Sequence, residues 1–339
     1  AASGIARPED GTTVADLKPN PSFRFDAKTC PISFHHGGKD PYTPNGSTQC
    51  YRELRKMKVP AELHLYADRG HGAFGLERAV EFINQMEFVA KLPGSRQQDH
   101  RFMPGATLRT EKEMLWPEGK IPNRSSNQAY EPYLVWFIPE KPTTKAIQVV
   151  LPGGGYRMLS DREAEPVALC FAKAGFQAYI LRYSVSKDGS PIWPQPLEET
   201  DAALRLIRAK RDEWHTDPDR IALCGFSAGA HLAACASVLL EEKPAATVLG
   251  YPVILPEACD FCLPGLPRPL EAVGPDTPPS FVFMAADDSM IAPQNGLDWA
   301  AALVKAQVPC ELHMYVRGEH GFTTGEPYLQ IAPGCSRLP

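Results

Sequence analysis

A serine flanked by glycines, in the pentapeptide Gly225-Phe226-Ser227-Ala228-Gly229, is the most informative group of residues in this chain. An apolar run at residues 220–224 precedes it, and a segment of small residues at 230–236 follows it. This order predicts a strand, a sharp turn and a helix, and a G-x-S-x-G turn in that setting is a nucleophile elbow. The glycines keep Cβ atoms out of the crowded turn, so that the Ser227 hydroxyl is exposed for nucleophilic attack.

A serine hydroxyl is a poor nucleophile near neutral pH and needs a base, which a carboxylate must hold in one tautomer. The chain supplies both partners after the serine, in the order Ser, Asp, His that this kind of elbow uses. Asp288 and His320 each follow an apolar run. Asp287 competes for the role of the acid, and we favour Asp288 because an internal repeat, described below, aligns it with Asp40, which has no acidic neighbour. The expected triad is therefore Ser227, His320 and Asp288.

Negative charge that develops on a substrate carbonyl oxygen needs hydrogen-bond donors, and a glycine-rich loop can present backbone N–H groups. Such a loop, Leu151-Pro152-Gly153-Gly154-Gly155-Tyr156, follows an apolar run. We expect the N–H groups of Gly154, Gly155 and Ala228 to form the oxyanion hole. The nucleotide-binding patterns G-x-G-x-x-G and G-K-[ST] are absent from this loop, which argues against a phosphate-binding role.

Three aromatic residues near the expected site are candidates for contact with a substrate, although ordinary core packing explains them equally well. They are Tyr156, Trp193 and Tyr251.

Apolar runs alternate with amphipathic segments over residues 131–326, a pattern typical of βαβ units and a mostly parallel sheet. Most of the runs are continuously apolar, as in a sheet covered by helices on both faces. Residues 255–279 are rich in Pro and Gly, which predicts either an excursion near the active-site rim or an ordinary surface loop. The expected strands are 133–138, 146–151, 177–182, 221–224, 247–251, 280–285 and 310–316, and the expected helices are 163–174, 196–214, 228–239 and 296–306.

The composition is that of a globular protein with a substantial core: 339 residues, of which 43% are hydrophobic and 22% charged. A net charge of -5 argues against nucleic-acid binding, and no apolar run is long enough to span a membrane. The first residues have no signal-peptide pattern, but a processed secreted protein would share that feature, so the compartment stays open. The oligomeric state also stays open.

Nine cysteines are present, and Cys259 and Cys262 form the one close C-x-x-C pair. A zinc site would need two further ligands at suitable spacing, and none lies nearby in the sequence. Unpaired thiols, a local disulfide and a metal site stay open for this pair. We expect no metal and no cofactor to take part in the chemistry.

The chain contains an internal repeat, because Pro60-Ala-Glu-Leu-His-Leu-Tyr66 matches Pro309-Cys-Glu-Leu-His-Met-Tyr315. A His follows in both copies, His71 in the first and His320 in the second. The first copy has no serine elbow, whereas the second has no apparent helix after its His. The expected organisation is an N-terminal extension (1–29), a partial hydrolase-like repeat without a nucleophile (30–92), a linker with the domain start (93–130) and a catalytic domain (131–339).

Two explanations of the repeat stay open. In the first, the chain is a piece of a tandem array, with a remnant of an upstream domain. In the second, the helix expected at residues 76–91 packs where the second copy lacks its own.

Residues 103–326 resemble the α/β-hydrolase superfamily, and within it the branch of acetyl-xylan esterases and feruloyl esterases. The triad motifs and the glycine loop carry the resemblance to the superfamily. The branch is indicated by Arg162-Glu-Ala-Glu-Pro166, Leu181-Arg-Tyr-Ser184 and the residues after the elbow. The resemblance implies an α/β-hydrolase fold, with a mostly parallel central sheet and helices on both faces.

The resemblance also implies a serine esterase that removes acetyl or hydroxycinnamoyl groups from plant polysaccharide, so a small acyl ester or acylated carbohydrate is the expected partner. A general short-chain aryl or lipolytic esterase is the alternative within the same chemistry. A peptidase of the prolyl-oligopeptidase type shares the order of the triad but normally carries a β-propeller, for which this chain has no room. A catalytically silent binding module is the alternative from another class.

Overall fold

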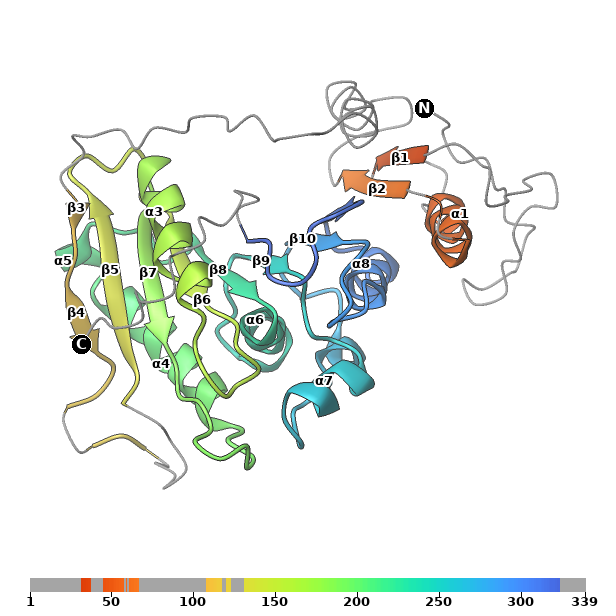
Figure 1. The fold of residues 1–339 in the computed structure, drawn as a ribbon. Helices are drawn as coiled ribbons and strands as arrows, with labels where there is room; N and C mark the ends of the chain where they lie inside the picture. Colours follow the sequence, from red (N-terminus) through yellow and green to blue (C-terminus); the bar gives the residue numbers. More distant parts are fainter. Residues whose placement is uncertain are drawn as a thin grey trace, which may run out of the picture.

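The computed structural model describes residues 32–37, 45–57, 59, 61–66, 108–117, 120–122 and 131–323. Within these ranges the strands form one sheet in the order β1-β2-β11-β10-β9-β8-β6-β7-β5-β3, and β4 pairs with β5 (Figure 1). The run β11-β10-β9-β8-β6-β7 is parallel throughout, whereas β5 joins β7 and β2 joins β11 in the antiparallel sense. The strands are β1 (Ile32–Gly37), β2 (Ala61–Tyr66), β3 (Leu108–Arg109), β4 (Lys112–Met114), β5 (Tyr133–Pro139), β6 (Ile147–Leu151), β7 (Gln177–Arg182), β8 (Ile221–Phe226), β9 (Ala246–Gly250), β10 (Ser280–Ala285) and β11 (Cys310–Tyr315).

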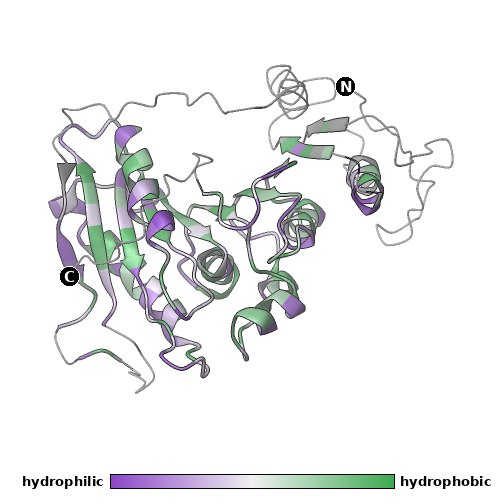
Figure 2. Cartoon of the chain, in the orientation of Figure 1, coloured by the Kyte–Doolittle hydropathy of each residue, from purple (hydrophilic) through white to green (hydrophobic). Residues whose placement is uncertain are grey.

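The central strands are apolar because helices cover both faces of the sheet, as expected from the sequence. Every residue of β6 is buried, and Figure 2 shows hydrophobic residues along β5 and through α6. Helix α3 packs on β5, β6 and β7, α6 packs on β6, β8 and β9, and α8 packs on β10 and β11. In Figure 1, α3 lies in front of the strands and α4 and α5 lie behind them. The α-helices are α1 (Asn45–Lys56), α3 (Glu165–Lys173), α4 (Gln195–Ala209), α5 (Arg211–Trp214), α6 (Ala228–Leu239), α7 (Pro256–Cys262) and α8 (Gln294–Lys305).

The expected helix at 196–214 is in fact two helices, α4 and α5, which meet at Lys210. The break allows Trp214 to reach the core, where its ring lies 4.6 Å from that of Trp136 and stacks on Tyr179. A single straight helix follows from the periodicity alone, but burial of the large indole decides the direction of the last turn.

Residues 255–279 contain regular structure that their sequence does not indicate. Helix α7 begins at Pro256, a residue well suited to the first turn of a helix. A short 3-10 helix follows at Pro269–Ala272. The segment is apolar where it meets the domain, since Cys259 and Leu263 are fully buried.

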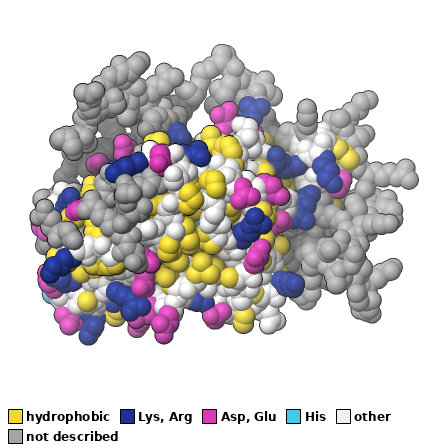
Figure 3. Space-filling view, turned by 90° about the horizontal axis from the view of Figure 1, so that it is seen from below, with side chains coloured by type: hydrophobic (Ala, Val, Ile, Leu, Met, Phe, Trp, Pro, Cys, Tyr) yellow, Lys and Arg dark blue, Asp and Glu magenta, His cyan; other side chains and the backbone are white. Residues whose placement is uncertain are grey.

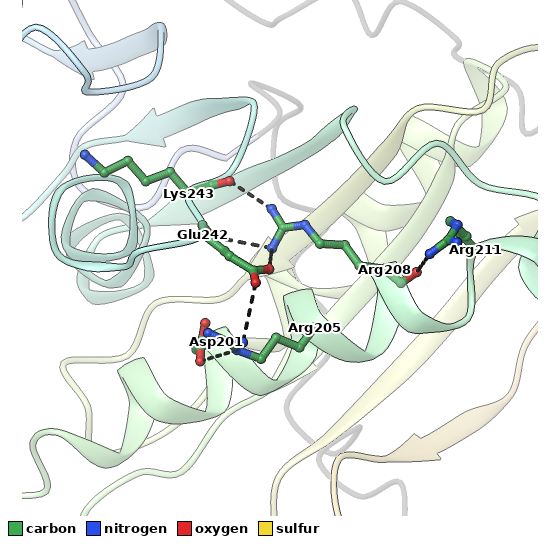
Figure 4. A network of polar contacts seen from close by, with 6 residues as sticks. All are labelled: Asp201, Arg205, Arg208, Arg211, Glu242 and Lys243. Carbon is green, nitrogen blue, oxygen red and sulfur yellow. Dashed lines mark hydrogen bonds and ion pairs between the residues drawn. The ribbon is translucent and has the colours of Figure 1, made fainter.

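Helix α4 is connected to the segment after α6 by a network of ion pairs and hydrogen bonds (Figure 4). Glu242 accepts hydrogen bonds from Arg205 at 3.4 Å and from Arg208 at 3.1 Å, and Arg208 also donates to the Lys243 carbonyl at 2.9 Å. Exposed ion pairs of this kind contribute little to stability, because water screens their charges. The network therefore orients the end of α6 that lies far from Ser227 and adds little stability.

The N-terminal repeat is joined to the sheet edge by strand pairing. Strand β2 runs antiparallel to β11, with His64 opposite His313, and α1 packs on β1 and β2. Tyr51, Leu54 and Leu63 are fully buried. The expected helix at 76–91, together with Asp40 and His71, lies outside the described residues. Strands β3 and β4 lie within the segment 93–130, which the sequence assigns to the linker and domain start, and both pair with β5.

Candidate active site

The expected site residues follow strands whose carboxyl ends meet at one edge of the sheet. Ser227 comes directly after β8, Asp288 follows β10, His320 follows β11, and the glycine loop follows β6. Because β6, β8, β9, β10 and β11 are parallel, these segments converge at that edge. This is the edge at which open α/β sheets place their ligands.

The turn between β8 and α6 has the strained geometry of a nucleophile elbow. Ser227 has a φ of 51°, a value that non-glycine residues rarely adopt. A Cβ at Gly225 would overlap the Gly229 carbonyl, and a Cβ at Gly229 would overlap the Leu151 carbonyl. Crowding therefore requires both glycines of the motif, and Ser227 stays 7% exposed.

The structure brings Ser227, His320 and Asp288 into one line of hydrogen bonds. The distance from Ser227 Oγ to His320 Nε2 is 2.9 Å, and that from His320 Nδ1 to Asp288 Oδ2 is 2.7 Å. With the Nδ1–H donated to Asp288, Nε2 is left to accept the Ser227 hydroxyl proton. This is the arrangement of a serine nucleophile with its base and its orienting acid.

The two neighbouring aspartates have different partners. Asp288 has a buried side chain, and its Oδ1 accepts the N–H groups of Met290 at 2.9 Å and Ile291 at 2.8 Å, so its other oxygen is fixed toward His320. Asp287 instead accepts the Glu319 N–H at 2.8 Å, and so holds the loop that carries His320. The contact with the imidazole belongs to Asp288.

The glycine loop lies against Ser227, and its first N–H group is already occupied. A Cβ at Gly153 would lie 2.9 Å from Ser227 Cβ, and the Gly153 N–H donates to Glu163 Oε2 at 2.8 Å. Within the part of the chain that the structure describes, the N–H groups of Gly154, Gly155 and Ala228 have no hydrogen-bond acceptor. The oxyanion hole expected at these three groups stays a prediction.

The sequence leaves three aromatic residues open between substrate contact and core packing. Tyr156 and Tyr251 are fully buried, and their hydroxyls contact His231 Nδ1 and Glu163 Oε1, each at 2.8 Å. Both rings are therefore packed in the core, and their hydroxyls have buried partners. Trp193 is partly buried and packs edge-on against Tyr156.

Two buried polar residues at the site escape the sequence analysis. His231 donates from Nε2 to the Pro267 carbonyl at 2.9 Å and accepts the Tyr156 hydroxyl at Nδ1, and burial lowers its pKa to about 4. It joins the elbow helix to the glycine loop. Glu163 connects that loop to Tyr251. Two sequence features could have pointed to them: His231 lies just after the elbow motif, and Glu163 lies within Arg162-Glu-Ala-Glu-Pro166.

Cys259 and Cys262 are free thiols with low exposure, and burial raises their pKa values to about 12 and about 11. Over the described ranges, no group of three or more His, Cys, Asp or Glu side chains is placed to hold a metal ion. Over the same ranges, no helix has both the length and the apolar character needed to cross a bilayer.

Hydrophobic side chains are exposed on segments that follow the converging strands. In Figure 3, which views the molecule from the side toward which β7 points in Figure 1, hydrophobic side chains gather at the centre and charged ones lie around them. Met158 is 57% exposed, Phe261 60% and Met290 59%. Met158 follows the glycine loop and Met290 follows Asp288, so these exposed apolar residues are close in sequence to residues of the site.

Two protein-family models match the chain. The BD-FAE model matches residues 136–253, which include the glycine loop and the serine elbow. The model of the dienelactone hydrolase family matches residues 17–87, the region of the N-terminal repeat.

Similar proteins include an acetylxylan esterase and an acetyl ester-xyloside bifunctional hydrolase. The chain is 30% identical to an acetylxylan esterase of Xylanibacter ruminicola, over 57% of this chain and 44% of the relative. It matches the crystal structure of an acetyl ester-xyloside bifunctional hydrolase from Caldicellulosiruptor lactoaceticus with a TM-score of 0.59 and 30% identity, over 66% of this chain and 92% of that one.

An α/β-hydrolase enzyme from a Medee basin deep-sea metagenome library matches with a TM-score of 0.55 and 30% identity, over 65% of this chain and 86% of that one. The chain spans only about two fifths of the length of the first curated relatives, 41% and 44%. The two structural matches cover most of the solved chains. The chain therefore belongs to the α/β-hydrolase superfamily.

Proposed function

We propose that this protein is a serine carboxylic-ester hydrolase that works through an acyl-enzyme. The observation that carries the proposal is the line of hydrogen bonds from Ser227 Oγ through His320 to Asp288, at 2.9 and 2.7 Å. The line lies beside a loop with unpaired N–H groups. A nucleophile, a base and oxyanion donors within reach of one another are the parts that acyl transfer requires.

In the first half of the reaction, Ser227 Oγ forms a bond to the acyl carbon while His320 Nε2 takes the hydroxyl proton. The carbonyl oxygen becomes an oxyanion, which the N–H groups of Gly154, Gly155 and Ala228 stabilise. Collapse of the tetrahedral intermediate breaks the bond to the alcohol oxygen, and His320 returns the proton to that oxygen. The alcohol leaves, and the acyl group stays on Ser227.

In the second half, His320 takes a proton from water, and the hydroxide oxygen attacks the acyl carbon. Breakage of the bond to Ser227 Oγ, with return of the proton to that oxygen, releases the acid. Asp288 keeps the imidazole in the tautomer with a proton on Nδ1 and stabilises the imidazolium that forms in both halves.

For the substrate, we infer an acetyl or hydroxycinnamoyl ester of a plant polysaccharide. The support comes from relatives named acetylxylan esterase and acetyl ester-xyloside bifunctional hydrolase. The exposed apolar residues Met158, Phe261 and Met290 are compatible with an acyl group at this face. They suit a general short-chain aryl or lipolytic esterase equally well, so the substrate test below includes that class.

The first experiment compares hydrolysis of p-nitrophenyl acetate by the intact chain and by its Ser227→Ala variant. We expect turnover with the serine and none without it, in a variant that keeps the wild-type circular dichroism. Acetylated xylan, methyl ferulate and a p-nitrophenyl ester of a longer acyl chain then separate the substrate classes. Absence of turnover together with absence of fluorophosphonate labelling at Ser227 would contradict the proposal and favour a silent binding module.

A further inference from the structure

A buried carboxylate connects the glycine loop to the histidine of the site. Glu163 is 3% exposed. Its Oε2 accepts the Gly153 N–H at 2.8 Å, and its Oε1 accepts the Tyr251 hydroxyl at 2.8 Å. A carboxylate away from water is costly unless its oxygens are hydrogen-bonded, and these two contacts satisfy both.

Tyr251 carries this connection to His320. The two ring centroids lie 4.8 Å apart with an interplanar angle of 67°, so the phenol packs against the imidazole. The Tyr251 N–H donates to the Phe283 carbonyl at 2.7 Å, and its φ of 36° shows that the surroundings hold it in a rarely adopted conformation. Burial, followed by the charge of Glu163, raises the pKa of Tyr251. The phenol therefore keeps its proton and donates a hydrogen bond to Glu163.

The first link acts on the oxyanion donors. Because Gly153 donates to Glu163, the loop is fixed one residue before Gly154 and Gly155, whose N–H groups have no acceptor within the described ranges. The space around Gly153 is filled: a Cβ there would lie 2.7 Å from Glu163 Oε2 and 2.7 Å from the Phe226 carbonyl oxygen. A shift of the carboxylate would therefore shift the loop.

From these contacts we propose that Glu163 is a positioning residue, which holds the oxyanion loop and the base of the reaction at fixed positions relative to each other. One oxygen holds the loop through Gly153, and the other holds His320 through Tyr251. Among the residues that the structure describes, Glu163 forms its hydrogen bonds with Gly153 and Tyr251, so it acts through these two partners. This inference rests on the esterase function proposed above.

The requirement is specific for a carboxylate because both partners are donors. A glutamine of the same shape offers one acceptor oxygen, and its NH₂ group would face either the Gly153 N–H or the Tyr251 hydroxyl. Hydrogen bonds to charged groups contribute more than neutral ones. Glu163→Gln therefore removes the link while keeping the volume.

The experiment measures kcat and KM for p-nitrophenyl acetate in Glu163→Gln, in Tyr251→Phe and in the double variant. Glu165→Gln is the matched control, because Glu165 lies two residues away and is exposed. We expect kcat to fall about 10- to 100-fold in Glu163→Gln, the size expected for loss of a hydrogen bond to a charged group. KM should stay the same. Glu165→Gln should match the wild type.

Tyr251→Phe removes only a hydroxyl, so it keeps the test decisive where Glu163→Gln fails to fold. We expect a smaller loss of kcat in Tyr251→Phe than in Glu163→Gln. Because the two residues act as one unit, the kcat of the double variant should lie within about twofold of that of Glu163→Gln. Wild-type kcat in a folded Tyr251→Phe, or a loss in Glu163→Gln that disappears when only folded protein is counted, overturns the inference.

Turnover and fluorophosphonate labelling of the wild type distinguish failure of the positioning role from failure of the proposed function. If the wild type neither turns over the ester nor takes the fluorophosphonate label, the proposed function fails, and the positioning role fails with it. If the wild type is active through Ser227 while both variants keep its kcat, only the positioning role is wrong.

Discussion

His64 and His313 occupy equivalent positions of the internal repeat and face each other across the junction of β2 and β11, with Nδ1 atoms 3.0 Å apart. The flanking pairs are also related by the repeat. Leu65 pairs with Leu312, and their equivalents in the other copy, Met314 and Leu63, pair with each other. Exchange of the two copies leaves this pairing unchanged, as in an isologous interface between identical subunits. The N-terminal repeat thus covers the edge strand that leads to His320.

This relationship predicts a disulfide between the two repeats in the variant His64→Cys/His313→Cys. Residues directly opposite in an antiparallel pair have Cβ atoms about 4.5–5.5 Å apart, close to the range that a disulfide needs. Mild oxidation should give a monomer with a 64–313 link, identified by peptide mass spectrometry, and should raise the unfolding midpoint.

The single variants His64→Cys and His313→Cys are the controls for the native thiols. They should give no such link. A double variant that forms only links between chains would show that β2 does not pair with β11 of its own chain.

The choice between the two aspartates predicts different kinetics for matched substitutions. Asp288→Asn removes the carboxylate that holds His320 in its tautomer, so kcat should fall on the order of 10⁴-fold. Asp287→Asn keeps an oxygen that can still accept the Glu319 N–H, so kcat should change by less than about tenfold. Rates with p-nitrophenyl acetate check both, and equal losses would remove the distinction.

Crowding in the glycine loop predicts that alanine is tolerated poorly at Gly153 and better at Gly155. A Cβ at Gly153 would lie 2.7 Å from Glu163 Oε2 and 2.9 Å from Ser227 Cβ, so Gly153→Ala must displace the loop. We expect kcat to fall about 10²-fold, as for loss of an oxyanion donor.

Gly155→Ala is the control for this prediction. Among the residues that the structure describes, none has an atom within 4 Å of a Cβ at Gly155, although its φ of 62° makes alanine unfavourable by about 1 kcal/mol. This variant should lose some stability and keep most of its kcat. Equal kcat in the two variants would contradict the role of crowding at Gly153.

The buried His231 predicts that stability falls in mild acid. Burial lowers its pKa from 6.5 to about 4, so the unfolded chain takes up the proton at a higher pH than the folded chain does. Between these values the unfolded state binds more protons, and the free energy of unfolding decreases as the pH falls. The loss attributable to His231 is about 3 kcal/mol between pH 6.5 and pH 4.

Urea unfolding at several pH values checks this prediction in the wild type and in His231→Gln, whose amide cannot titrate. The variant should have a flatter pH dependence over that window, whatever its absolute stability. His215→Gln, at an exposed histidine, should keep the wild-type slope. A parallel slope in His231→Gln would show that other groups cause the acid sensitivity.

The sequence by itself determined the features that depend on local chemistry. The serine elbow, the glycine loop and the order Ser227, Asp288, His320 follow from neighbours along the chain, because a strained turn needs glycines and a parallel sheet brings strand ends together. The alternation of apolar and amphipathic segments likewise predicted a mostly parallel sheet with helices on both faces. The resemblance of the motifs to a known superfamily implied the α/β-hydrolase fold, which the solved relatives support.

Only the tertiary structure decided which groups share a buried space. Asp287 and Asp288 are adjacent in sequence, yet the hydrogen bonds of Met290 and Ile291 turn only Asp288 toward His320. Tyr251 looks like a substrate contact until its hydroxyl is found on Glu163, 88 residues away. Pairing of His64 with His313 spans 249 residues. Such contacts depend on how distant elements pack, and no short-range pattern in the sequence encodes that packing.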